Sequence, residues 1–233
     1  VEHGKLEFVG KRRGIRMGST KKRGSPSGEQ TRQRILDATL HTLQEQGIVG
    51  TSARAIARTG DFNQALIFYH FGSVDEAIVA AVGELSRRRL ARYREPLMAV
   101  DNVTGLIEVA RDLYEHDRDS GEVTILTQAF AGASRNPEMG PAMFDHIEAW
   151  NQLIAEVVDR AIASSPLGGT LVGRSVPRGE IAKGISGLFL GIELLGQLDP
   201  ERTDTDAMFS SIAAMAQLAE SMLESAFSNM GAT

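Results

Sequence analysis

The hydrophobic pattern of this chain is helical from about residue 29 to residue 228. Apolar side chains recur every three or four positions, which places them along one face of each predicted helix. The pattern predicts helices over 29–47, 51–58, 63–71, 73–95, 102–118, 121–134, 141–164, 178–198 and 204–228. The glycine-rich segment 165–177 is expected to be a linker. No alternating pattern typical of strands stands out, so we expect an all-α fold.

The stretch TSARAIARTGDFNQALIFYHF predicts two short helices separated by a sharp turn. Thr51 or Ser52 is suited to cap the first helix. Gly60 and Asp61 tolerate the left-handed conformation that ends a helix, and Asn63 is placed to begin the second. This arrangement is typical of a helix-turn-helix, whose second helix enters the major groove of DNA. The alternative is an ordinary pair of short packed helices.

This stretch resembles the tetracycline-repressor (TetR) family of bacterial transcription regulators, and the resemblance is specific over about residues 29–80. The residues that match the family pattern without a gap are Thr51, Ile56, Ala57, Ile67, His70, Phe71 and Ser73. The turn departs from that pattern at Gly60-Asp61-Phe62. Phe68 and Val74 stand where the family usually has tyrosine and lysine, so two expected phosphate contacts are missing. The resemblance implies a DNA-binding regulator with a three-helix N-terminal domain.

The resemblance also implies which side chains meet DNA. Those expected to face base edges are Arg54, Gln64, Ala65, Leu66 and Phe68. Those expected to contact the phosphate backbone are Thr51, Asn63, Tyr69, His70 and Ser73. Arginine can bond guanine, glutamine can bond adenine, and an apolar side chain can meet the thymine methyl. A core position is the alternative for Leu66 and Phe68.

Charge is divided unevenly along the chain. Residues 1–71 carry 12 Lys/Arg and 6 Asp/Glu, which leaves 13 of the 25 basic and 24 of the 30 acidic residues for 72–233. Residues 1–28 hold 8 of those basic residues among recurrent glycines. We expect a disordered basic arm there that contacts phosphates or the minor groove. A solubilising tail and a translation start at Met17 are the alternatives.

The composition limits the possible chemistry. The absence of cysteine excludes disulfides and thiolate metal sites, and it suits a cytoplasmic, nucleoid-associated protein. The histidines at 3, 41, 70, 116 and 146 lack the spacing of metal ligands. No apolar run reaches the length of a membrane span. We therefore expect neither an enzyme nor a cofactor, a metal or a membrane partner. The arginines at 87, 88, 89, 92 and 94 are expected to form a solvated face.

The last two predicted helices carry more apolar surface than a single chain needs. Three glycines follow one stripe of the helix over 178–198, where small residues allow another helix to approach closely. The helix over 204–228 is apolar on two sides and so needs two partners. We expect a homodimer formed through Ile181, Gly184, Gly187, Gly191, Met208, Ile212, Met215 and Met222. A helix sandwiched within one chain is the alternative.

Large apolar side chains gather in the helices between 102 and 164, which suits a pocket for a small organic ligand. The candidate ligand-binding residues are Tyr114, Phe130, Met143, Phe144, Ile147 and Trp150, with Tyr114 and His146 as polar anchors. Plain core packing is the alternative for each of them.

Together these features predict a disordered arm over 1–28, a DNA-binding domain over 29–72, and a ligand-binding and dimerisation domain over 73–233. We expect a repressor that binds a palindromic operator as a homodimer and is released by a small-molecule effector. The alternatives are a helical ligand-binding or protein-interaction module without sequence-specific DNA binding, and an architectural DNA-binding protein.

Overall fold

The structure is a computed structural model that describes residues 27–134, 136–165, 169–199 and 201–230. All regular elements in these ranges are helices, so the all-α prediction is confirmed. They are α1 (Gly28–Gly50), α2 (Ala53–Gly60), α3 (Ala65–Phe71), α4 (Val74–Ala99), α5 (Val103–Ser120), α6 (Glu122–Ala133), α7 (Met139–Ser164), α8 (Leu171–Ser175), α9 (Arg178–Leu198) and α10 (Thr205–Met230). The predicted basic arm lies almost wholly outside the described residues.

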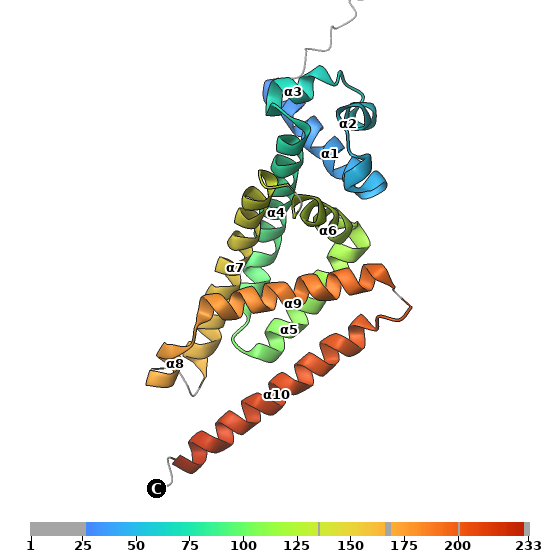
Figure 1. The fold of residues 1–233 in the computed structure, drawn as a ribbon. Helices are drawn as coiled ribbons and strands as arrows, with labels where there is room; N and C mark the ends of the chain where they lie inside the picture. Colours follow the sequence, from blue (N-terminus) through green and yellow to red (C-terminus); the bar gives the residue numbers. More distant parts are fainter. Residues whose placement is uncertain (1–26, 135, 166–168, 200, 231–233) are drawn as a thin grey trace, which may run out of the picture.

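Figure 1 shows α1, α2 and α3 gathered at one end of the long helix α4. From there α4 runs into a larger group of helices formed by α5, α6, α7 and α9. Helix α9 packs against α7, while α10 packs along α5 and extends away from the α1–α3 end of the molecule. The arrangement therefore joins a small helical unit to a larger one through α4, and also through the contact of α1 with α6.

The turns of the helix-turn-helix are fixed by short polar side chains. Ser52, rather than Thr51, caps α2, and Ser73 caps α4; each accepts a hydrogen bond from the backbone N–H three residues on, at 3.3 and 3.1 Å. Asp61 adopts the left-handed conformation after α2, with φ of 51°. Asn63 accepts a hydrogen bond of 2.9 Å from the backbone N–H two residues on, which begins α3. The sharp turn predicted from these residue types is present.

A small apolar core holds α3 against α1, α2 and α4. It consists of Ile35, Ala38, Ile56, Ile67 and Ala77. Ile67 is the buried residue of α3, whereas the next side chain, Phe68, is 51 % exposed. Leu66 is half-buried and packs against the same core. The core position considered for Phe68 is therefore wrong, and for Leu66 it is right in part.

A second core crosses the boundary expected near residue 72. It joins the α1 residues Leu36, Leu40 and Leu43 to apolar residues of α4, α6 and α7. The backbone N–H of Ile48 also donates a hydrogen bond of 3.3 Å to Oε1 of Gln128 in α6. Gly132 in α6 faces Ile48 so closely that an added Cβ would lie 2.5 Å from Cγ1 of Ile48. Helix α6 therefore rests directly on the end of α1.

Two expectations about the helices are wrong. The segment 165–177 is not wholly a linker, since it contains α8: Thr170 accepts a hydrogen bond of 3.0 Å from the N–H of Gly173 and caps this short helix. Helix α4 continues through Pro96 to Ala99. Proline removes one backbone hydrogen bond, but Pro96 lies on the exposed side and the buried Leu97 anchors the last turn. Tertiary packing overrides the local stop signal there.

The opposite environments of two neighbouring residues in α3 give a direct test of this fold. We expect Ile67→Ala to lower the free energy of unfolding by about 2–5 kcal/mol, because it removes a fully buried side chain. Phe68→Ala should cost less than about 1 kcal/mol, since much of its ring already faces water. Urea denaturation followed by circular dichroism measures both. Equal losses would mean that α3 is rotated relative to its core.

Candidate DNA interface and effector cavity

The outer face of α3 exposes the side chains predicted to read DNA. Gln64, Ala65, Phe68 and Tyr69 are all exposed, the last to 82 %. Arg54 of α2 is exposed as well. Large aromatic side chains that face water on a rigid, well-packed helix are typical of an interaction surface. The combination of amide, guanidinium and aromatic groups matches what base edges in the major groove can bond or contact.

Arg34 in α1 holds the turn that presents this face. Its Nη2 donates hydrogen bonds to the backbone carbonyls of Gly60, at 2.9 Å, and Asp61, at 3.1 Å. These carbonyls lie at the C-terminal end of α2, where a cation also complements the helix dipole. The sequence analysis missed Arg34 because its two partners are 26 and 27 positions away along the chain. Nearby, the guanidinium of Arg32 lies 5.1 Å from the ring centroid of Phe71.

The residues expected to contact the phosphate backbone differ in whether they have a free hydrogen-bond donor. The rings of Tyr69 and His70 pack edge to face, with their centroids 5.0 Å apart. Ser73 accepts a bond as the α4 cap and so keeps its own O–H as a donor. Thr51 is buried, and its O–H donates to the carbonyl of Gly47 at 2.8 Å. The structure therefore uses the Thr51 hydroxyl inside the fold, which argues against the predicted phosphate contact from this donor.

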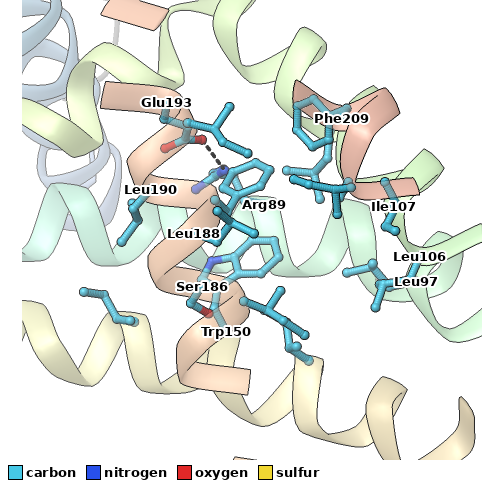
Figure 2. Close-up of a pocket in the computed structure, with 18 of the residues that line it drawn as sticks. Arg89, Leu97, Leu106, Ile107, Trp150, Ser186, Leu188, Leu190, Glu193 and Phe209 are labelled. Carbon is cyan, nitrogen blue, oxygen red and sulfur yellow. Dashed lines mark ion pairs between the residues drawn. The ribbon is translucent and has the colours of Figure 1, made fainter. Parts of the chain in front are cut away.

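A cavity of about 450 Å³ lies within the larger helical group, lined by residues of α4, α5, α6, α7, α9 and α10. Its wall is mostly apolar (Figure 2). Of the residues predicted to bind a ligand, Phe130, Ile147 and Trp150 line the cavity, together with the possible anchor His146. This size and character suit a small organic ligand.

The other three predicted ligand residues lie outside the cavity wall. Tyr114 and Met143 are buried in separate apolar clusters, and Phe144 is 55 % exposed. Helical periodicity shows that a side chain faces inward, but it does not distinguish a packed core from a cavity. The pocket therefore includes residues that the sequence analysis did not select, chiefly from α9 and α10.

A buried charged cluster forms one side of the cavity, and Arg89 is its centre. Nε of Arg89 donates a hydrogen bond of 2.9 Å to Oδ2 of Asp117, whose other oxygen accepts one of 2.9 Å from the Tyr93 hydroxyl. Glu122 and Glu193 lie 3.6 and 3.8 Å from the Arg89 guanidinium. The solvated face expected for the α4 arginines is therefore wrong at Arg89, because three carboxylates, on α5, α6 and α9, draw it inward.

Glu193 is the least compensated member of this cluster. The residue is 1 % exposed, and neither carboxylate oxygen has a hydrogen-bond partner within the described part of the chain. Burial raises the pKa of Glu193 to about 7, against the lowering effect of Arg89 and with a further increase from Asp117. Ser186 Oγ and Trp150 Nε1 are likewise buried without a partner, and all three residues line the cavity.

Comparison with known proteins finds a family match for the helix-turn-helix and the helices that support it. Residues 35–81, which span most of α1 to the first part of α4, match the family model described as bacterial regulatory proteins, tetR family. Over these residues the chain is similar to the TetR family of regulators.

The chain spans about half the length of the curated HTH-type relatives that it matches. The HTH-type transcriptional regulator UidR of Escherichia coli K12 is 29 % identical over 109 residues, 47 % of this chain and 55 % of that protein. The nicotine-responsive transcriptional repressor HdnoR of Paenarthrobacter nicotinovorans is 28 % identical over 111 residues, 47 % of this chain and 57 % of that protein. Both are described as transcriptional regulators, and neither is described as an enzyme.

A solved structure shares the fold over most of both chains. The putative transcriptional regulator from Saccharomonospora viridis in complex with choline has a TM-score of 0.65 and 18 % identity, and the match covers 81 % of this chain and 96 % of that one.

Among the residues that our structure describes, no group of three or more His, Asp or Glu side chains is placed to hold a metal ion.

The buried acid gives a pH test of the cluster. Because the pKa of Glu193 is raised from 4.5 to about 7, the folded state holds a proton that the unfolded state has lost between these values. The free energy of unfolding should therefore fall as pH rises from 4.5 to 7, by up to roughly 3 kcal/mol. We expect Glu193→Gln to remove this dependence, as measured by urea denaturation at a series of pH values.

Glu180 is the matched control, because it lies on the same helix but is exposed. Glu180→Gln should leave the pH profile of stability unchanged. If Glu193→Gln and Glu180→Gln have the same profile as the parent protein, Glu193 is ionised in the folded state over the whole range and the account of the cluster fails.

Proposed function

We propose that the protein is a ligand-responsive repressor that binds a palindromic operator as a homodimer and releases it when a small organic effector occupies the cavity. The observation that carries this proposal is the outer face of α3, where Gln64, Phe68 and Tyr69 are exposed on a helix fixed by a buried core. A helical ligand-binding module without DNA recognition has no use for such a face. An exposed recognition helix on a rigid support is what major-groove binding requires.

DNA recognition in this proposal divides between bases and phosphates. Arg54, Gln64, Ala65, Leu66 and Phe68 face the bases, and the half-burial of Leu66 leaves part of its side chain for a thymine methyl. Asn63, Tyr69, His70 and Ser73 contact the phosphates, which set the orientation of the helix. The basic residues of 1–28 add affinity that depends on salt but not on sequence.

Release of DNA requires a physical link from the cavity to α1, and Leu126 of α6 supplies one. Leu126 lines the cavity and also belongs to the core that joins α6 to Leu36, Leu40 and Leu43 of α1. A ligand that displaces Leu126 must therefore shift the surface against which α1 packs. Because α1 supports α2 and α3, such a shift changes how the two recognition helices of a dimer are placed. This follows the rule that an effector acts through its preference between two states.

The dimer in this proposal uses the outer sides of α9 and α10. Ile181, Gly184 and Gly187 of α9 and Met215 and Met222 of α10 are exposed. Met208 and Ile212, which we had also expected there, pack instead on the cluster around Phe209. By length and apolar character α9 would be able to span a membrane. A second copy of the chain explains its apolar surface equally well and also supplies the second recognition helix that a palindrome needs.

The first test of this function is direct readout. An operator is selected from a random duplex library with the full-length protein, and Gln64→Ala is then compared with the parent protein on it by fluorescence anisotropy. We expect a loss of about 1–3 kcal/mol on the selected operator and little change on random DNA, because the amide bonds a base edge and not the backbone. Gln152→Ala, an exposed glutamine on α7, should change neither affinity.

Two outcomes would contradict the assignment. If no preferred sequence emerges from the library, the protein is not a sequence-specific regulator. If Gln64→Ala weakens operator and random DNA equally, Gln64 contacts the backbone and does not read bases.

The dimer is tested at Gly187. No atom of the chain lies within 4 Å of a Cβ built on Gly187, so Gly187→Leu is accommodated within one subunit. The substitution should also favour the helix, since glycine costs roughly 1 kcal/mol relative to a good helix former. We expect sedimentation to show monomers and operator affinity to fall in parallel. Gly179→Leu, also in open space but at the start of α9, should stay dimeric; a dimeric Gly187→Leu would place the interface elsewhere.

A further inference from the structure

The charged cluster beside the cavity contains one more acid than it has cations to balance. Its charged residues and their neighbours are Arg89 and Arg92 from α4, Asp117 from α5, Glu122 from α6 and Glu193 from α9. Three carboxylates thus share two guanidinium groups. Arg89 and the Tyr93 hydroxyl already bond Asp117, and Arg92 bonds Glu122 at 3.2 and 3.3 Å. Glu193 is the acid left over.

The position of Glu193 relative to the cavity is what points to a ligand. Both of its oxygens are buried without a hydrogen-bond partner among the described residues, and its nearest cation is 3.8 Å away, beyond hydrogen-bond distance. Figure 2 shows Glu193 beside Arg89 at the cavity, with Trp150 and Phe209 on the surrounding wall. A buried acid without partners is costly to ionise. A positive group placed in the cavity would remove that cost.

The other walls favour a cation with an apolar body. Phe130, Phe189 and Phe209 line the cavity together with Trp150, and aromatic faces attract cations. An anion would need Arg89, whose guanidinium is already bonded to Asp117 and lies 5.1 Å from the Trp150 ring centroid. His146 is the ionisable residue that α7 contributes to the wall, and none of the α10 residues there can ionise.

We propose that the effector is an organic cation of the ammonium type, with an aromatic or branched apolar body, whose charge pairs with Glu193. This rests on the proposed function for the word effector, but the binding preference itself does not depend on DNA. Binding of the cation fixes Glu193 in its ionised form. Since burial holds the pKa of the free protein's Glu193 at about 7, a cation that binds below this pH must displace a proton to the buffer.

The test uses two probes of the same size and shape and opposite charge, tetraphenylphosphonium and tetraphenylborate. Isothermal titration calorimetry with the full chain should show binding of the phosphonium at least tenfold tighter than that of the borate. Affinity for the phosphonium should rise about tenfold from pH 6 to pH 8. At pH 6, titrations in buffers of different ionisation heat should show release of close to one proton, which a purely structural role for Glu193 would not produce.

Glu193→Gln keeps the shape and one acceptor oxygen but removes the charge. We expect it to weaken phosphonium binding at least tenfold and to abolish both the pH dependence and the proton release, while Glu180→Gln leaves all three unchanged. Circular dichroism of each variant confirms that it is folded. The proposal is overturned if the borate binds as tightly as the phosphonium, if neither binds, or if Glu193→Gln binds the phosphonium as the parent protein does.

The two proposals fail separately. Absence of sequence-specific operator binding would remove the regulator function and leave the cation site intact. Charge-selective binding that leaves operator affinity unchanged would keep the site but end its role as an effector site. Operator binding with no preference for the phosphonium would keep the repressor and reject the cation.

Discussion

The packing of Leu36, Leu40 and Leu43 of α1 against α4, α6 and α7 is the constraint on which the other features depend. A unit of three short helices has little apolar surface of its own, and the core that these helices form with the start of α4 is small. Sharing a larger core supplies the stability that α3 needs in order to expose aromatic side chains. Because α1 and α6 share this core, the DNA-binding unit cannot move independently of the larger unit. A movement of α6 is transmitted to α1.

The sequence predicts the helices well because their signals are local. Periodic apolar residues and capping side chains such as Ser52, Asn63 and Ser73 act within a few positions of one another. Arg34 and Arg89 were not recognised because their partners are distant in the chain. Arg89 is one of five arginines of α4 that look alike in sequence, and only the approach of α5, α6 and α9 distinguishes it. Burial of a charge is decided by tertiary packing, which periodicity does not report.

The candidate sites differ in the same way. The α3 face was predictable, because the residues on the opposite side of a short amphipathic helix must face outward once Ile67 is in the core. The cavity was predictable only in part. Phe130, Ile147 and Trp150 line it, but Glu193 and Ser186 come from a helix that the sequence analysis assigned to dimerisation alone. A helix packed between a cavity and an outer surface has apolar residues on both sides. The glycines of α9 indicate only the outer surface, so the side that faces the cavity was not recognised.

The energetics of release set a condition on the ligand that follows from this shared architecture. In the proposed repressor, ligand binding and DNA binding weaken each other by the same factor, since coupling between two sites is reciprocal. A ligand that merely filled the cavity would stabilise both states alike and would leave the operator occupied. In this proposal the effector must displace Leu126, which belongs both to the cavity wall and to the core shared with α1. An organic cation held at Glu193 is fixed at one end, so the bulk of its apolar body determines how far the opposite wall must move.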